Sequence, residues 1–207
     1  MCIRDRSCLQ TNASRYDKGG DMHYDIISAF IKSIRGSDPN AAIYYLARML
    51  DGGEDPKFIA RRLCISASED IGLANPNALL LANDCFQTVS SIGMPEGRIP
   101  LAETTIYLAS SPKSNSAYLA INEAMQVASQ TQAESVPMPL RNAPTKLMEE
   151  LGYHDGYKYS HDFPGHFVDQ EYMPEGLKGK VFYQPAENRH EDALAAYLKS
   201  CWPKYYK

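Results

Sequence analysis

Apolar residues recur at helical spacing through the first two thirds of the chain, and short polar turns separate them. The first apolar face consists of Ile26, Ile27, Phe30, Ile31 and Ile34. Three of the turns end in Asp-Pro or Asn-Pro, at residues 38–39, 55–56 and 75–76. Asp and Asn side chains accept hydrogen bonds from the free N–H groups of a first helical turn, and proline fits the first helical position. The pattern therefore predicts consecutive antiparallel helices.

Six helices are expected between residues 15 and 129. The first begins at about residue 21, and the next three follow Pro39, Pro56 and Pro76. The fifth and sixth are expected at about residues 99–109 and 115–128, where apolar residues keep helical spacing. The prediction for this region is therefore all-α.

The pattern changes after residue 129. A polar and then proline-rich stretch predicts a loop, a short helix is expected at residues 145–151, and a last amphipathic helix lies within residues 187–202. Residues 153–179 are rich in Tyr, His, Gly and Pro without a sustained period, so we expect them to be ordered only where their aromatic side chains dock. Residues 180–184 are expected to form one short strand.

The predicted fold is therefore an all-α array or bundle of helices with an irregular C-terminal extension. We divide it into a leader and linker at residues 1–14, a helical domain at 15–129, and an extension at 130–207 that packs on it. The leader begins MCIRDRS, which has charges but no apolar core of a signal peptide. It continues no pattern found downstream, so we expect it to be artefactual or disordered.

Composition fits a soluble globular protein, which places the expected location in the cytoplasm. The 207 residues are 22% charged and 44% hydrophobic, with a net charge of −4. No apolar run approaches the roughly 18 residues of a membrane span. The five cysteines contain no C-x-x-C pair, which favours free thiols in a reducing compartment.

Signatures of catalysis are absent from the sequence. The nearest approach to a phosphate-binding loop is Gly179-Lys180, but Val181 replaces the required Ser or Thr and Pro174 replaces the first glycine. No G-x-S-x-G motif occurs. Three histidines lie near two aspartates, at residues 154–166, on a Gly- and Pro-rich coil that does not suit a rigid metal site. We therefore predict no catalytic, cofactor or metal-binding residues.

Two surfaces are candidates for binding. Basic residues near helix ends could contact DNA phosphates or a partner, although ordinary solvated charges remain the alternative; they are Arg61, Arg62, Lys113, Arg141 and Lys146. The early helices carry more apolar residues than a lone helical layer needs, which predicts an interface between copies of the chain. Its candidate residues are Tyr44, Tyr45, Leu46 and Met49.

Several long segments carry a resemblance to a known family. They include RGSDPNAA at residues 35–42, SEDIGLA at 68–74 and SPKSN at 111–115. The chain after residue 14 resembles the C-terminal region of the replication-associated recombination protein A family. These AAA+ ATPases are related to clamp loaders and are also called MgsA or, in eukaryotes, Werner-helicase-interacting protein.

The resemblance implies a helical domain like a clamp-loader collar, which assembles the protein into a homotetramer. ATP and Mg²⁺ are expected only in an ATPase region preceding it, and no cofactor is expected here. The implied role is at blocked replication forks, in recombination and repair, close to the nucleoid. Implied partners are DNA, single-stranded DNA-binding protein and replication-fork proteins.

Two other classes of function stay open from the residues alone. One is a stand-alone helical module that binds DNA directly through the basic residues. The other is an independent hydrolase or metalloenzyme, which the missing motifs disfavour.

Overall fold

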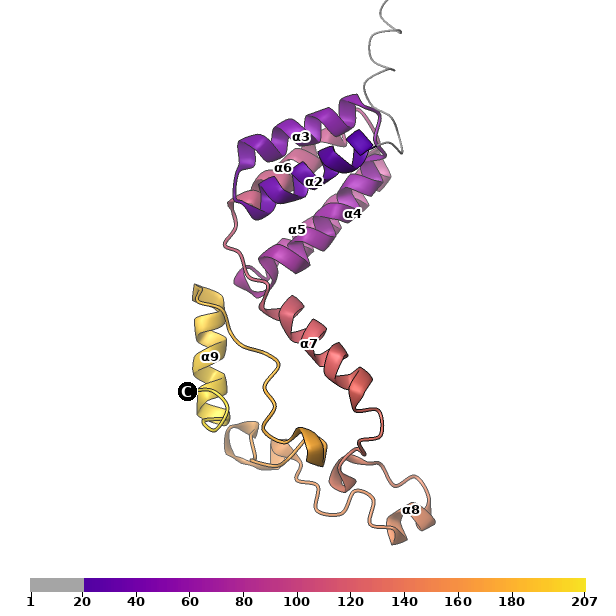
Figure 1. The fold of residues 1–207 in the computed structure, drawn as a ribbon, viewed down its shortest axis with the longest axis vertical. Coiled ribbons are helices and arrows are strands. Elements are labelled where there is room, and N and C mark those ends of the chain that lie inside the picture. Colours follow the sequence, from indigo (N-terminus) through magenta and orange to yellow (C-terminus); the bar gives the residue numbers. More distant parts are fainter. Residues whose placement is uncertain (1–20) are drawn as a thin grey trace, which may run out of the picture. The chain divides into compact units, whose positions relative to one another are not determined.

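A computed structural model describes residues 21–207 of the chain, and the leader predicted at residues 1–14 lies outside them (Figure 1). Within the described residues the regular structure is helical and no strand forms, which confirms the all-α prediction. No helix there combines the length and apolar character that crossing a membrane requires. The chain divides into two units, which we call unit 1 (up to Tyr118) and unit 2 (Leu119–Lys207).

Unit 1 contains five α-helices and two short irregular helical turns. The α-helices are α2 (Asp21–Arg35), α3 (Pro39–Asp51), α4 (Pro56–Ser66), α5 (Asn77–Ile92) and α6 (Arg98–Ser110). The two turns between α4 and α5 are the π-helix η1 (Ala67–Ile71) and the 3₁₀-helix η2 (Gly72–Ala74). α2 packs on α3, α4 packs on α5, and α6 contacts α3 and α5. The core between them includes Phe30, Leu63 and Leu108.

The predicted helix starts are confirmed at the first two dipeptides. The Asp38 carboxylate accepts from the N–H groups of Asn40 and Ala41 at 3.0 and 2.9 Å, and that of Asp55 accepts from Lys57 N–H at 3.0 Å. At the third dipeptide the Asn75 side chain accepts from Asn77 N–H at 3.2 Å. Here the proline precedes the helix, so α5 begins one residue later than the pattern predicts.

Gly72 ends η1 against the segment that follows α6. Its φ of +48° lies in the left-handed region, and a Cβ at this position would stand 2.8 Å from the carbonyl oxygen of Ser114. Ser114 N–H in turn donates to the carbonyl oxygen of Asp70 at 2.9 Å. Only glycine allows the two backbones to approach this closely.

Unit 2 takes up most of α7 (Ser116–Gln130), the short α8 (Lys146–Glu150) and α9 (Arg189–Cys201). Between α7 and α9 the chain forms four single 3₁₀ turns: η3 (Met138–Leu140), η4 (Ser160–Asp162), η5 (Pro164–His166) and η6 (Glu175–Leu177). The predicted domain boundary at residue 129 lies close to the end of α7, whereas the two units divide near its start.

The irregular segment of unit 2 docks on the single tryptophan of the chain, Trp202. The rings of Phe167 and Tyr172 meet Trp202 edge-on, with centroids 5.2 and 6.3 Å away, and Tyr205 stacks on it at 5.5 Å. Lys204 lies over Trp202 and forms an ion pair with Asp169 at 3.0 Å. Residues 153–179 are expected to be ordered only where their aromatic side chains dock. The ring contacts of Phe167 and Tyr172 with Trp202 are docking of this kind.

The strand predicted at residues 180–184 does not form, and this prediction is wrong. The segment has no neighbouring strand within the described residues. Its polar groups bond to side chains of the C-terminal region instead: Tyr206 Oη donates to the Tyr183 carbonyl at 3.1 Å, and Tyr183 Oη donates to Glu191 at 3.0 Å. A β-strand is defined by backbone hydrogen bonds to a neighbouring strand. In this segment, hydrogen bonds that involve side chains replace them.

Candidate functional site

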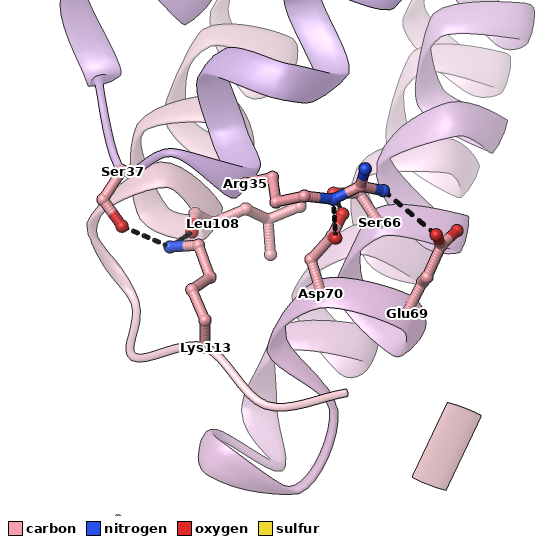
Figure 2. A network of polar contacts seen from close by, with 7 residues as sticks. All are labelled: Arg35, Ser37, Ser66, Glu69, Asp70, Leu108 and Lys113. Carbon is pink, nitrogen blue, oxygen red and sulfur yellow. Dashed lines mark hydrogen bonds and ion pairs between the residues drawn. The ribbon is translucent and has the colours of Figure 1, made fainter. Parts of the chain in front are cut away.

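A cluster of paired polar side chains joins three parts of unit 1 (Figure 2). We call it the polar node; it consists of Arg35, Ser37, Ser66, Glu69, Asp70 and Lys113. Arg35 is the last residue of α2, and its guanidinium reaches η1, where Nε donates to Asp70 Oδ1 and Nη2 donates to Glu69 Oε1 at 3.0 Å. Ser66 Oγ donates to Asp70 Oδ2 at 2.7 Å.

Asp70 is the buried centre of the polar node, since its side chain is only 5% exposed. A carboxylate removed from water needs a charged partner and hydrogen bonds to both oxygens. Arg35 supplies the first and Ser66 completes the second. The hydrogen bond to Asp70 is also the main reason why the pKa of Arg35 is raised. The π-helical turn therefore carries a fully paired acidic group.

Lys113 binds the C-terminal end of α6 rather than facing solvent. Its ammonium donates to the carbonyl oxygens of Leu108, Ala109 and Ser111 at 3.1, 3.0 and 2.6 Å, and to Ser37 Oγ at 2.9 Å. A cation at this place satisfies carbonyls that the helix leaves unpaired. Partial burial lowers the pKa of Lys113. This arrangement stabilises the turn and occupies the donors that a phosphate would need.

Two further basic candidates lie on α4. Arg61 on α4 is exposed, pairs with Asp55 at 3.5 Å and lies over the Phe58 ring. Arg62 is half-buried on the same helix, and its Nε has no hydrogen-bond partner within residues 21–207. The printed partners of Lys113 and Arg61 differ, since Lys113 binds the end of α6 and Ser37 whereas Arg61 pairs with Asp55.

The remaining two basic candidates belong to unit 2. Arg141 donates to the Val136 carbonyl at 2.7 Å and lies over the Tyr153 ring, with 5.2 Å between guanidinium carbon and ring centroid. Lys146 is exposed at the first position of α8. A DNA surface formed by these residues stays a prediction.

The four residues of α3 that were predicted to form an interface between copies differ in how far their side chains are exposed. Leu46 and Met49 lie in the core, with 3% and 1% of their surfaces exposed, because α3 turns this face toward the neighbouring helices. Tyr45 is half-buried against the core. Tyr44 alone of the four is mainly exposed, at 59%. Leu46 and Met49 therefore act in folding, which corrects their expected placement on a surface.

An open apolar groove of about 480 Å³ runs between α3 and α6. Apolar side chains line it: Ile43, Leu46, Ala47, Leu50, Ile99 and Ala102, with Arg98 and Glu103 beside them. α6 is apolar on both sides, since Leu101 and Leu108 are buried while Ile99 and Ile106 are 61% and 47% exposed. Exposed apolar residues that gather on one side of a helix often mark a surface for association, so this groove is a candidate for a binding surface.

Three histidines of unit 2, His154, His161 and His166, lie on the irregular segment, and His190 lies on α9. The rings of His161 and His166 are 5.0 Å apart, and His154 lies 5.1 Å from Tyr157. Within the described part of the chain, no three His, Cys, Asp or Glu side chains group in a way that could hold a metal ion.

Comparison with known families accounts for almost the entire chain. A family model described as MgsA AAA+ ATPase C terminal matches residues 36–202. A second model, described as AAA C-terminal domain, matches residues 5–35. Arg35 is the last residue of the second match, and its partners Glu69 and Asp70 belong to the first. The polar node therefore connects the two matched regions.

Relatives from several bacteria agree with this result. An AAA domain-containing protein of Mycobacterium tuberculosis is 51% identical over 90% of this chain and 41% of its own length. Replication-associated recombination protein A of Bacillus subtilis is 48% identical over 90% of this chain and 44% of its own length. The protein of the same name from Coxiella burnetii is 48% identical over 86% of this chain and 40% of its own length.

The chain thus spans less than half the length of these relatives. The resemblance found in the sequence is confirmed by the family match and by the names of the relatives. This chain belongs to the MgsA AAA+ ATPase C-terminal family.

Proposed function

We propose that this chain is the oligomerisation and partner-binding domain of a AAA+ ATPase that acts at replication forks, in recombination and repair. The observation that carries the proposal is the groove between α3 and α6, where Ile99 is 61% exposed and Ile43, Leu50 and Ala102 are only partly buried. Exposed apolar surface of this kind marks sites of protein association. The names of the relatives support the connection to replication and recombination.

In this proposal the domain forms a homotetramer in the cytoplasm, near the nucleoid. ATP and Mg²⁺ bind to the ATPase region of the full-length protein, and DNA, single-stranded DNA-binding protein and fork proteins are its partners. The fully paired polar node supports a structural role for this chain, since its charged groups bond to one another and to the backbone.

Light scattering on a sizing column tests the proposal. We expect the chain to have a mass above that of one copy, and Ile99→Glu in the groove to lower this mass because it places a charge on the apolar surface. Ile65→Glu is the matched control, since Ile65 is 45% exposed on α4, outside the residues that line the groove. Equal masses for the two variants would contradict a role for the groove.

Direct DNA binding is the second candidate function. It is favoured by the exposed Arg61 beside Arg62, whose Nε is unpaired within the described residues. Binding through phosphate contacts weakens steeply as salt rises. If this candidate holds, Arg61→Ala with Arg62→Ala will reduce both the affinity for single-stranded DNA and its dependence on salt. Unchanged affinity would exclude this surface.

A further inference from the structure

The segment at residues 181–184 in unit 2 has the composition of a strand but no partner strand. It lies in the coil that leads from η6 to α9 (Figure 1). Val181, Phe182 and Tyr183 are β-branched or aromatic, the types that favour strands. Within the described residues none of the segment's backbone N–H groups donates a hydrogen bond, and of its carbonyls only that of Tyr183 accepts one, from Tyr206 Oη. Most of this backbone is therefore unpaired in a single chain.

An open pocket of about 550 Å³ adjoins the segment, and α9 and the C-terminal residues complete it. Apolar and aromatic side chains form most of its lining: Val181, Pro185, Ala195, Ala196, Tyr205 and Tyr206. The hydrogen bond from Tyr206 to the Tyr183 carbonyl, 3.1 Å long, fixes one wall against the segment. Pockets that bind ligands have volumes in this range and a mainly apolar lining. This pocket is large enough for an apolar side chain of another protein.

Two cations at the pocket lack an acidic partner. Lys199 on α9 and Lys207 both line the pocket and are exposed. Among the salt bridges of the described part of the chain, none involves either ammonium group. No Asp or Glu belongs to the pocket lining, and the Glu191 carboxylate that meets Tyr183 is fully buried. The side chains of the pocket therefore complement a ligand that carries negative charge.

The unpaired backbone favours a peptide over a nucleic acid as this ligand. A peptide in extended form offers N–H and C=O groups at the spacing of a neighbouring strand, and such pairing is a common mode of peptide recognition. A nucleic acid would instead need exposed aromatic faces on which bases can stack. Tyr205 is half-buried and already stacks on Trp202, with 5.5 Å between ring centroids.

We propose that residues 181–184 and the adjoining pocket bind an extended acidic peptide of a partner protein. The peptide backbone pairs with the unpaired backbone of the segment, one apolar side chain enters the pocket, and carboxylates meet Lys199 and Lys207. Pairing gives the segment the neighbouring strand that its sequence favours, which accounts for the difference between the sequence pattern and the single chain. The inference rests on the proposed partner-binding role and assigns a surface to it.

Peptide binding to the full chain, measured by fluorescence anisotropy, tests the inference. The probe is a short fluorescein-labelled peptide with glutamates on both sides of a central leucine. We expect Lys199→Glu and Lys207→Glu each to weaken binding by about tenfold, because each replaces an attraction with a repulsion. Ala196→Phe fills the pocket, so it should remove the preference for this peptide over one with a central alanine. A probe with alternate backbone nitrogens methylated should bind weakly, since it cannot complete the pairing.

Matched controls are Arg189→Glu and Ala193→Phe, at exposed positions of α9 outside the pocket. Both should bind the probe like the unmodified chain, and circular dichroism confirms that every variant is folded. The inference would be overturned if the unmodified chain did not bind the probe, bound a lysine-flanked peptide equally well, or responded to Lys199→Glu no more than to Arg189→Glu.

Two further measurements identify a different occupant of this surface. Binding of single-stranded oligothymidine that Lys199→Glu abolishes, with no binding of the peptide, would assign the surface to nucleic acid. A fall in the mass of the chain in Ala196→Phe but not in Ala193→Phe, measured by light scattering, would assign it to a second copy. Either result would overturn the peptide site. A chain that keeps the mass of an oligomer but does not bind the probe would overturn this inference and leave the proposed oligomerisation standing.

Discussion

Unit 1 buries apolar side chains between packed helices, whereas unit 2 holds its irregular segment through a few aromatic and polar anchors. In unit 1, Phe30, Leu63 and Leu108 are at most 1% exposed. In unit 2 the only side chain among the largest fully buried ones is that of Glu191, a carboxylate. The periodic core of unit 1 therefore distributes its contribution to the free energy of folding over many residues. The irregular segment of unit 2 depends on a few contacts.

The largest effect is expected in the core of unit 1. Phe30→Ala removes a ring that is 1% exposed and leaves a cavity, so we expect a loss of ~3–5 kcal/mol in the free energy of unfolding. Urea unfolding followed by far-UV circular dichroism measures it. Tyr24→Ala on the same helix is the control, since Tyr24 is 66% exposed. A Phe30 variant as stable as the control would contradict the assigned core.

A single polar residue should have a comparable effect in unit 2. The Glu191 carboxylate accepts from Tyr183 Oη at 3.0 Å, from Ala186 N–H at 3.1 Å and from Asn188 Nδ2 at 2.9 Å. Glu191→Ala leaves these donors without their acceptor, at a cost of about 3 kcal/mol.

Fluorescence of Trp202 measures this loss in unit 2, because it is the chain's only tryptophan. Glu191→Gln keeps one acceptor oxygen and should lose less than Glu191→Ala. If the two variants were equally stable, the hydrogen bonds would not be the source of the effect.

The polar node should contribute less to the free energy of unfolding than Phe30 or Glu191 does. Arg35→Met leaves the Asp70 carboxylate, 5% exposed, without its charged partner. Because the Arg35 side chain is itself 49% exposed, water and salt screen the pair, and we expect a loss of about 1–2 kcal/mol. Glu69→Gln is the control, with an expected loss below about 0.5 kcal/mol. Urea unfolding of unit 1 separates the two, and equal losses would contradict Asp70 as the buried centre.

The smallest effect is a dependence of unit 2 on alkaline pH. Burial first, and then the hydrogen bond to Glu191, raise the pKa of Tyr183 from 10.0 to about 12. Between these values the folded chain keeps a proton that the unfolded chain releases. The contribution of Tyr183 to stability is therefore complete below pH 10 and is lost as the pH rises toward 12.

Unfolding followed by Trp202 fluorescence across this range measures the effect. In Tyr183→Phe the pH dependence should be weaker, since this variant has no phenol to titrate. An identical decline in both chains would assign the effect to other groups.

The same contrast explains how far the sequence could predict the structure. The starts of α3 and α4 follow from Asp-Pro caps, whose hydrogen bonds join neighbouring residues. The α-helices of unit 1 follow from apolar periodicity. The place of Leu46 and Met49 depends on which side of α3 meets its neighbours, and an apolar residue suits a core and an interface equally well.

The polar node and the anchors of unit 2 could not be found in this way. Arg35 and Asp70 belong to two segments that carry the family resemblance, but their contact joins distant positions and depends on the π-helical turn of η1. The aromatic content of residues 153–179 indicates that docking is needed, yet it does not identify Trp202 as the place. Long-range contacts between irregular segments have no period for a sequence pattern to reveal.

The mass of the unmodified chain in solution tests the central claim most directly. Light scattering on a sizing column, repeated over a range of concentrations, should give four times the mass of one chain at tens of micromolar, because we propose a homotetramer in which the groove between α3 and α6 forms one of the contacts between copies. A mass of one chain throughout that range would contradict the account.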